Sequence, residues 1–447
     1  MHAAFLVAIL VLLGFCFQGS RPLWEPDEGR FVNIALQMLD SGDWWVPRFN
    51  DEQIHLAKPP MTYWLLAASM TVFGRNEWAA RVPHAIAFVL TALLVADIAR
   101  GLASARPRLA ALVWATSVAP LAGAFVVTTD AILVLFQAAA MCAMVRAGVP
   151  QAENIDRRWI RLCWLAFALA FLTKGPPGLL PLLAIVVWLA WQRRWQTLGG
   201  LFDAVGVAVF LGVGLGWYVA IAARVPGAAG YFLGYEFVDR IFTGVHGRNA
   251  AWYGALSVYV PTLVLGLLPW WPFTLRRPEA AGESSPALPR SSRGFLWSWF
   301  AVPMVCFALA RSRLPLYVLP LFIPLTVLVT DRIGVPQRSP RTLALFATAW
   351  IVAVVIAKGL LADLSSERDA KELTQEFAAA AARLSGPLSE IVFVDAAPEF
   401  GLRLYTAAPV KELSLAGASD SERRVLCREI DAAGSALWLV PEKVAGP

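Results

Sequence analysis

The stretch PPMTYWLLAASMTVF, from Pro59 to Phe73, decides how this chain is arranged. Its two leading prolines suit the first turn of a helix, and its apolar side chains recur on one helical face. A transmembrane helix needs about 20 apolar residues, with about 17 as the usual minimum. The stretch is shorter than that, and Thr62, Ser69 and Thr71 make it partly polar. We therefore expect a helix that lies flat in a membrane interface instead of crossing the bilayer.

The arginine-rich loops elsewhere in the chain support the flat orientation. If 59–73 crossed the bilayer, all of these loops would lie outside, whereas the positive-inside rule requires them to lie inside. The loops are 100–108, 157–158, 193–194, 276–277 and 332–341. A second interfacial helix is expected earlier in the same outer loop, because apolar residues recur there at helical spacing. These residues are Phe31, Ile34, Ala35 and Met38.

The composition excludes a soluble enzyme, a disordered chain and a nucleic-acid-binding module as descriptions of the whole chain. Apolar residues make up 58% of the 447 residues and charged residues 16%, whereas soluble domains carry roughly 25% charged residues. The 19 tryptophans suit membrane interfaces, and we expect short inner loops, rather than an acidic partner, to account for the net charge of +6. The five cysteines show no paired spacing, so neither a disulfide framework nor a zinc site is indicated.

Eleven apolar runs are candidate membrane spans. They are 3–18, 82–99, 109–127, 131–147, 160–173, 178–192, 204–222, 252–274, 294–310, 314–330 and 342–357. The first run lacks a basic flank and a cleavage site, so we expect it to be an uncleaved span. The runs 160–173 and 178–192 are short for a span and are expected to be broken or tilted. We predict an all-α polytopic membrane domain over residues 1–360, with about eleven to thirteen transmembrane helices and the interfacial helices of the first outer loop.

The tail, residues 361–447, has the sequence pattern of a water-soluble domain. Apolar strands alternate with helical segments, which predicts a small α/β domain on the outer, periplasmic side. The expected helices are 366–384, 399–405 and 422–430, and the expected strands are 391–394, 410–413 and 436–440. The tail contains no phosphate-binding loop or catalytic motif. We expect it to serve as a cover or docking element instead of a second enzyme.

This topology gathers most of the unusual polar residues on the outer face. The outer segments are 19–81, 128–130, 174–178, 223–251, 311–313 and the tail from about 361. The spans are nearly free of charge at mid-depth, where a charged side chain costs at least about 2.5–3.5 kcal/mol. Pumps and transporters usually place ionisable groups at that depth. We therefore expect an enzyme that works at one membrane surface, with a lipid flippase or transporter as the alternative.

Three carboxylates open the first outer loop within the segment from Trp24 to Arg30. They are Glu25, Asp27 and Glu28. Such a cluster at a membrane surface is costly unless its members are solvated, paired or bound to a cation. Asp27 could simply cap the helix that follows. The other hypothesis is that Asp27 points at a reacting hydroxyl or a bound cation, and the spacing alone leaves both open.

Several outer cations stand where an anion would be favoured. Lys58 precedes a helix start, where backbone N–H groups attract anions, although a lysine there could also extend to lipid headgroups. Lys174 repeats this arrangement between two short spans. Arg311 and Arg313 lie on the side where basic residues are unusual, and an anionic lipid phosphate would explain them.

Two further outer residues are weaker candidates. Asp130 follows a span and could be a structural cap. His246, in a segment with Arg248, is more often structural than a ligand, as a lone histidine usually is. Taken together, these residues form a one-sided cluster of carboxylates and cations above an apolar bundle. We expect the cluster to handle a lipid-linked anionic donor whose tail stays in the bilayer.

Six motifs, in order along the chain, carry a family resemblance from Leu23 to about Phe322. They are Trp24-x-Pro26-Asp27-Glu28-x-Arg30, Ser41-Gly42-Asp43-Trp44-x-Val46-Pro47, Lys58-Pro59, Thr173-Lys174-Gly175, Leu268-Pro269-Trp270 and Leu314-Pro315-x-Tyr317. With these motifs the chain resembles the GT-C class of membrane glycosyltransferases, which use polyprenyl-phosphate sugars. It is most similar to the bacterial transferases that add aminoarabinose to lipid A, and more distantly similar to protein O-mannosyltransferases.

The resemblance implies an inverting transfer of a pentose or hexose from a polyprenyl-phosphate donor at the outer, periplasmic face of the bacterial inner (plasma) membrane. The acceptor would be a lipid A-like or other envelope glycolipid, with Ser or Thr of exported proteins as the alternative. Membrane lipids are expected partners and nucleic acids are not. The sequence does not indicate which sugar is transferred.

The resemblance also implies roles for individual residues. Asp27 would orient or deprotonate an acceptor hydroxyl, or position an acceptor that is already a phosphate, and Lys58 would stabilise the leaving lipid phosphate. The expected catalytic residues are Asp27, Glu28, Lys58 and Asp130. The expected donor-phosphate ligands are Arg30, Lys174, Arg248, Arg311, Arg313 and Tyr317.

One departure from the family pattern concerns a metal ion. Close relatives carry a glutamate directly before the lysine, and this carboxylate with the outer-loop histidine looks like a metal pair. Here that position is Ala57, while His246 is kept. A divalent cation at that place is therefore doubtful, although one near Asp27 and Glu28 stays open because carboxylates suit hard ions. The same departure leaves a catalytically inactive scaffold as a further alternative.

Overall fold

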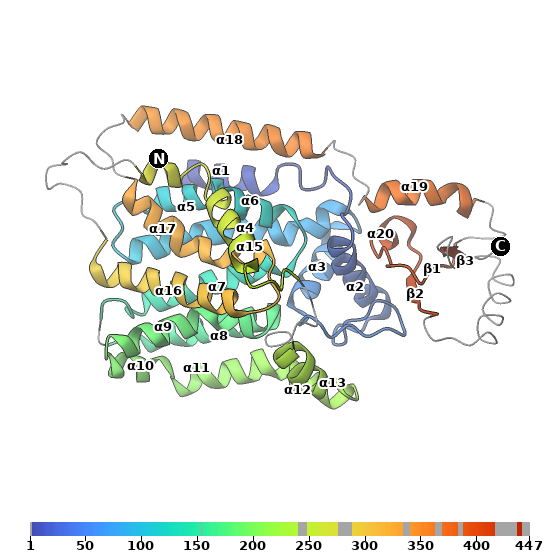
Figure 1. Cartoon of the computed structure of the whole chain (residues 1–447), viewed down its shortest axis with the longest axis horizontal. Coiled ribbons are helices and arrows are strands. Elements are labelled where there is room, and N and C mark those ends of the chain that lie inside the picture. Colours follow the sequence, from blue (N-terminus) through green and yellow to red (C-terminus); the bar gives the residue numbers. More distant parts are fainter. Residues whose placement is uncertain are drawn as a thin grey trace. The chain divides into compact units, whose positions relative to one another are not determined.

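The computed structural model describes residues 2–152, 154–239, 248–275, 288–333, 340–362, 369–382, 388–415 and 436–439. These residues are mostly helical and include one small sheet (Figure 1). Their contacts divide the chain into two compact units. The bundle unit comprises Met1–Gln18, Leu56–Met61 and Val82–Gly359, and the loop–tail unit comprises Gly19–His55, Thr62–Arg81 and Leu360–Pro447. Each unit is described by itself.

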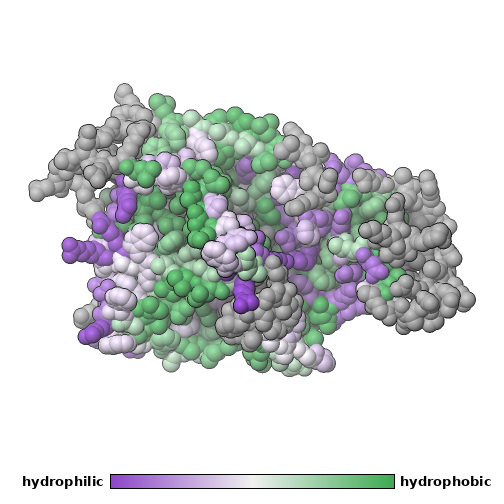
Figure 2. Space-filling view, viewed as in Figure 1, coloured by the Kyte–Doolittle hydropathy of each residue, from purple (hydrophilic) through white to green (hydrophobic). Residues whose placement is uncertain are grey.

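The bundle unit is built almost entirely from apolar helices. In chain order they are α1 (Ala3–Phe15), α4 (Glu77–Gly101), α5 (Pro107–Thr116), α6 (Val118–Phe125), α7 (Thr129–Arg146), α8 (Arg157–Lys174), η1 (Pro176–Leu179), α9 (Leu180–Trp191), α10 (Trp195–Leu201), α11 (Ala204–Val209), η2 (Phe210–Leu215), α12 (Gly216–Arg224), α13 (Ala228–Gly230), η3 (Tyr231–Asp239), α15 (Gly254–Gly266), η4 (Trp271–Thr274), α16 (Arg290–Leu309), η5 (Pro315–Leu321), α17 (Phe322–Arg332) and α18 (Pro340–Ala362). Hydrophobic side chains cover much of these helices on the face shown in Figure 2.

All eleven apolar runs predicted from the sequence contain helix. Among the described residues, six helices are long and apolar enough to cross a membrane by length and composition, and the bent pair α5–α6 makes a seventh if it is one span. Four shorter apolar helices are Ala3–Phe15, Met61–Phe73, Pro176–Trp191 and Gly254–Gly266. The chain is therefore a multi-pass membrane protein, and its total of spans stays a prediction.

The 59° bend between α5 and α6 has a local cause. The hydroxyls of Thr116 and Ser117 bond back to carbonyls four residues earlier, which competes with the helical pattern. Pro120 has no N–H to continue the ladder. The Thr116 carbonyl instead accepts a hydrogen bond of 2.8 Å from the Trp350 indole in α18. A buried backbone group therefore keeps a partner at the break.

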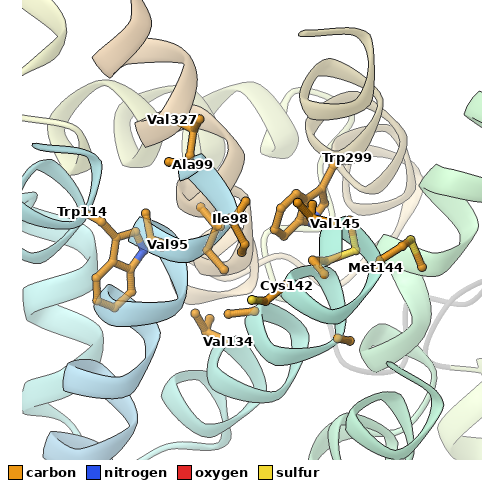
Figure 3. Close-up of a cluster of buried hydrophobic side chains, with 14 of the residues drawn as sticks. Val95, Ile98, Ala99, Trp114, Val134, Cys142, Met144, Val145, Trp299 and Val327 are labelled. Carbon is orange, nitrogen blue, oxygen red and sulfur yellow. The ribbon is translucent and has the colours of Figure 1, made fainter. Parts of the chain in front are cut away.

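The interior of the bundle unit is a continuous hydrophobic cluster, part of which is drawn in Figure 3. There Val95 and Ile98 of α4 lie between Trp114 and the side chains of α7, including Cys142 and Val145. Helix α7 packs against α8, and α16 packs against α9. Helix α18 differs, because only 11% of its most apolar window is buried. Its exposed face is suited to lipid.

The loop–tail unit combines the first outer loop with the tail. It contains α2 (Asp27–Ser41), α3 (Met61–Phe73), α19 (Ala370–Ala381), α20 (Leu402–Thr406), β1 (Glu390–Val394), β2 (Val410–Leu413) and β3 (Ala436–Leu439). The strands form a parallel sheet in the order β2-β1-β3. The central strand β1 is buried beyond its first residue, as an apolar strand of a parallel sheet should be.

The predicted elements of the tail are confirmed where the structure describes them. The strands 391–394, 410–413 and 436–440 correspond to β1, β2 and β3, and the helix 399–405 is present as the shorter α20. The described part of the helix 366–384 is α19. The helix 422–430 lies outside the described residues.

Both helices predicted in the first outer loop are also present. In α2 the side chains predicted to share an apolar face, Phe31, Ile34, Ala35 and Met38, are all buried. The ring of Phe31 lies 5.6 Å, centroid to centroid, from the ring of Tyr63 in α3. Their placement in a membrane interface stays a prediction.

Candidate active site

Asp27 is the first residue of α2. Pro26 occupies the cap position, so the hypothesis that Asp27 is the N-cap is wrong. The Asp27 carboxylate instead forms an ion pair with Arg30, one turn later in the helix. More than half of the Asp27 side chain, 55%, is exposed. The carboxylate is therefore held by its neighbour and accessible to a ligand.

Glu28 has the opposite environment, because its side chain is fully buried between two arginines. Its Oε2 lies 2.6 Å from Arg21 Nη1 and 2.9 Å from Arg81 Nη2, and it also accepts a bond from the Trp24 N–H. Burial alone would raise the pKa of Glu28, but Arg81 and Arg21 outweigh it and hold the pKa at about 2. Glu28 is thus ionised and enclosed. The sequence pattern gave no signal for either arginine partner.

Glu25 is the third carboxylate of the segment, and it is also buried. Its Oε1 accepts a hydrogen bond from the backbone N–H of Gly401 in the tail. Burial raises its pKa to about 8, with the charges of Glu399 and Glu28 acting in the same direction. The three carboxylates of this segment therefore differ in environment. Asp27 is exposed and paired, Glu28 is buried and ionised, and Glu25 is buried and largely protonated near neutral pH.

Lys58 lies in the part of the first loop that belongs to the bundle unit. It comes three positions before Met61, the first residue of α3. Its side chain is half-buried, and its Nζ donates a hydrogen bond of 2.8 Å to the Ala57 carbonyl. The ammonium is thus held beside the segment that leads into α3. Backbone N–H groups at the start of a helix attract anions.

A second cluster, within the bundle unit, joins Asp130, Lys174 and Tyr317. Asp130 stands in the first turn of α7, and Lys174 is the last residue of α8. The two side chains form an ion pair, and the Lys174 Nζ lies 4.4 Å from the centroid of the Tyr317 ring. Each charge also suits its helix end, since acids favour N-termini and bases favour C-termini. Thr128, and not Asp130, is the N-cap of α7, because its hydroxyl accepts the Asp130 N–H.

Two residues that the sequence analysis missed hold this cluster in place. His84 of α4 approaches the Thr128 carbonyl with its Nε2 at 2.7 Å. Gln137 of α7 donates hydrogen bonds to the carbonyls of Pro177 (2.8 Å) and Gly178 (3.2 Å) in η1. Gln137 could have been noticed, because it is an amide within an apolar helix. His84 left no comparable signal.

The arginines predicted to bind the donor phosphate differ in their environments. Arg313 is buried, and its guanidinium donates to the carbonyls of Asn249 (2.9 Å) and Ala251 (2.8 Å). It therefore braces the segment that carries Arg248. The side chains of Arg248 and Arg311 are exposed. Arg30 belongs to the loop–tail unit, where it pairs with Asp27.

A divalent cation in this protein stays a prediction. The described residues contain no group of three or more His, Cys, Asp or Glu that could hold an ion. Ala57 offers no side-chain donor, and both oxygens of Glu28 are bonded to arginine. The bonds of Glu28 count against the cation position near Asp27 and Glu28, whereas Ala57 counts against the position before Lys58. His246 lies outside the described residues, so its predicted role as a ligand stays a prediction.

Among the candidate residues that the structure describes, Asp27 and Arg30 pair within the loop–tail unit, and Asp130, Lys174 and Tyr317 meet within the bundle unit. The predicted gathering of all these residues on a single outer rim stays a prediction.

Comparison of the fold gives the class of protein. The crystal structure of ArnT from Cupriavidus metallidurans bound to undecaprenyl phosphate matches with a TM-score of 0.75 at 21% identity, covering 97% of this chain and 89% of that chain. A family model described as dolichyl-phosphate-mannose-protein mannosyltransferase matches residues 57–217. The chain therefore has the fold of the GT-C membrane glycosyltransferases, as its motifs predicted.

Sequence relatives give a narrower group within that class. The undecaprenyl phosphate-alpha-4-amino-4-deoxy-L-arabinose arabinosyl transferase of Edwardsiella ictaluri is 34% identical over 343 residues, which is 75% of this chain and 59% of the relative. The enzyme of the same name from Erwinia tasmaniensis is 32% identical over 355 residues, or 77% and 61% respectively. The chain is thus related in sequence to these arabinosyl transferases, and it spans less than two thirds of their length.

Proposed function

We propose that this protein transfers a sugar from a polyprenyl-phosphate donor to a lipid A-like or other envelope glycolipid at the periplasmic face of the bacterial inner membrane. The observation that carries the proposal is the similarity to the aminoarabinose arabinosyl transferases over three quarters of the chain. The related fold of ArnT, whose structure contains undecaprenyl phosphate, supports a lipid-phosphate donor. The apolar helices would hold the lipid tail of the donor.

The donor loses a lipid phosphate, whose negative charge grows in the transition state. Preorganised cations lower the energy of that charge more than the energy of the ground state. Lys58 and Lys174 have this role in our proposal. Asp130 and the Tyr317 ring hold the Lys174 ammonium in position, so that little reorganisation is needed when the phosphate develops its charge. Arg248 and Arg311, whose side chains are exposed, are further ligands for the phosphate.

Asp27 acts on the acceptor. Its exposed carboxylate takes the proton of an acceptor hydroxyl as the sugar is transferred, or positions an acceptor that is already a phosphate. Arg30 fixes the direction of that carboxylate through their ion pair. The burial of Glu28 between two arginines favours a positioning role over contact with substrate. Arg313 likewise supports its segment through backbone carbonyls. No step in this mechanism uses a metal ion.

The experiment that tests the proposal uses the purified full chain in lipid vesicles with an undecaprenyl-phosphate sugar and lipid A. Asp27→Asn and Lys58→Met should each lower transfer by about 100-fold, since general-base and electrostatic contributions are commonly of that size. Glu52→Gln is the matched control, because it neutralises a carboxylate of the same loop that is 74% exposed. Wild-type rates for Asp27→Asn and Lys58→Met in folded protein would remove the site assignment.

Transfer to Ser or Thr of exported proteins is the second candidate. The match of residues 57–217 to a protein mannosyltransferase model favours it. Mass spectrometry of a deletion strain separates the two acceptors. Loss of a sugar from the glycolipid fraction supports the first proposal, and loss from secreted proteins supports the second. Head-group movement across vesicles without bond cleavage would instead indicate a flippase.

A further inference from the structure

The tail is bonded to α2 by one buried arginine. Arg403 of α20 is only 6% exposed, and its guanidinium reaches three polar side chains of α2. It donates to the Gln37 amide oxygen at 2.6 Å, to Asp40 at 2.7 Å and to the Asn33 amide oxygen at 3.3 Å.

These three acceptors form a stripe along α2. They are spaced i, i+4 and i+7, which places them on one helical face. Asn33 and Gln37 are buried although they are polar. An unpartnered amide in such a place would be costly, so the stripe and Arg403 satisfy each other. The planar guanidinium, with its several donors in a fixed fork, is suited to three acceptors at once, whereas a lysine is not.

The same tail segment also holds the chain just before α2. The N–H of Gly401 bonds to the Glu25 carboxyl, and the Tyr405 hydroxyl accepts the Leu23 N–H at 3.0 Å. Gly401 and Tyr405 thus bond to residues before Asp27, and Arg403 bonds to residues after it. A shift of α20 would change the direction in which the Asp27 carboxylate points, because Asp27 begins the helix that Arg403 fixes.

We propose that Arg403 is a positioning residue for the transfer reaction, because its bonds to the α2 stripe aim Asp27 at the acceptor. This inference rests on the proposed function. It gives the tail a positioning role in the reaction, although the tail sequence contains no catalytic motif.

The principal test compares Arg403→Lys with wild type at saturating donor. The lysine keeps the charge but cannot bond all three acceptors, so we expect a kcat about tenfold lower and a donor KM within twofold of wild type. Lys411→Ala is the control, since Lys411 also belongs to the tail but forms its ion pairs, among the described residues, with the peripheral Glu52 and Glu390. It should leave kcat unchanged. Rates are normalised to folded protein, so that loss of material does not imitate a loss of kcat.

A double-mutant cycle with Asp27→Glu shows whether Arg403 acts through Asp27. If the two substitutions act independently, their fold-losses of kcat multiply. If Arg403 acts through Asp27, the fold-loss of kcat in the double variant is well below the product of the two single losses. Gln37→Met removes one acceptor without a large change in volume, and it serves if Arg403→Lys folds poorly. We expect about a threefold loss of kcat for Gln37→Met.

Two results would overturn the inference. One is an unchanged kcat for Arg403→Lys and Gln37→Met while Asp27→Asn remains inactive, which would leave the proposed function intact. The other is full multiplicativity in the cycle. Wild-type transfer by Asp27→Asn would instead contradict the site on which the inference depends.

Discussion

The carboxylate of Asp130 and the ammonium of Lys174 form an ion pair whose side chains are only 8% and 10% exposed. They come from the start of α7 and the end of α8, two helices that pack against each other. The pair therefore joins two helix ends and keeps a cation in place at a break between apolar segments.

Removing one member of this pair should be costly. Asp130→Asn or Lys174→Met leaves a buried charge without its partner, which typically costs about 3–5 kcal/mol. The double variant should lose less than the sum of the two single losses. Denaturant unfolding of the solubilised protein measures this. Arg75→Gln, which breaks the exposed pair with Asp40, is the control and should cost at most about 1 kcal/mol. Equal losses in the control and the single variants would contradict the buried-pair description.

Glu28 should make the loop–tail unit sensitive to acid. Because its pKa falls from 4.5 to about 2 on folding, its contribution is complete above about pH 4.5 and is lost as the pH falls toward 2. The shift corresponds to about 3 kcal/mol. Glu28→Gln should remove this acid-dependent part of the stability and leave Arg21 and Arg81 without their carboxylate. Thermal unfolding of both proteins between pH 3 and pH 7 tests this, and parallel curves would refute it.

Glu25 should act in the opposite direction. Its pKa rises from 4.5 to about 8, so the folded protein holds a proton that the unfolded chain releases. The stabilisation is complete below about pH 4.5 and is lost as the pH rises to about 8, at up to about 1.4 kcal/mol per pH unit. In Glu25→Gln the side chain stays neutral. The difference in unfolding temperature between wild type and this variant should therefore change across that window, and a constant difference would count against a buried, protonated Glu25.

Gly178 lies where a side chain would not fit. A Cβ at this position would come 2.8 Å from backbone atoms of Ala170, whereas a Cβ at Gly199 would meet nothing within 4 Å. We expect Gly178→Ala to cost about 1–3 kcal/mol, as overpacking usually does, and to lower transfer, because η1 begins two residues after Lys174. Gly199→Ala is the matched control and should be neutral or slightly stabilising. Denaturant unfolding and transfer assays on both variants test this, and equal stability and transfer rates for the two variants would contradict it.

The predicted topology can be tested by labelling single cysteines in a cysteine-free background. Arg311 and Arg193 are both exposed, and the sequence predicts them on opposite sides of the membrane. An impermeant maleimide should label Arg311→Cys in intact spheroplasts and Arg193→Cys only after lysis. Labelling of both in intact spheroplasts would reverse the side assigned to one of these loops.

Sequence patterns predicted the parts of the fold that depend on local periodicity. The apolar face of α2 and strands β1, β2 and β3 follow from the spacing of side chains along one segment. The number of spans does not, because short apolar helices such as Ala3–Phe15 have lengths that suit neither a span nor a surface helix clearly.

Polar partners were the harder part of the candidate site. The residues of the Asp130–Lys174 pair were both singled out by their place at span ends. The ion pairs of Glu28 with Arg21 and Arg81 were missed. Arg81 is 53 positions from Glu28, and no periodic pattern relates Glu28 to either arginine. The contact of Arg403 with Gln37 spans 366 positions and was equally hidden. Such pairs depend on tertiary packing, which a single sequence does not display.

The bond between Leu23 and Tyr405 joins residues 382 positions apart, on either side of the helical bundle in the sequence. A ribosome makes the first outer loop long before it makes the tail. On the topology that the sequence predicts, that loop is exported first, and its polar stripe stays hydrated until the last helices have been inserted and the tail has followed. Maturation of Asp27's surroundings is thus a late event in biogenesis, and a chain whose translation stops early carries the aspartate without the scaffold that orients it.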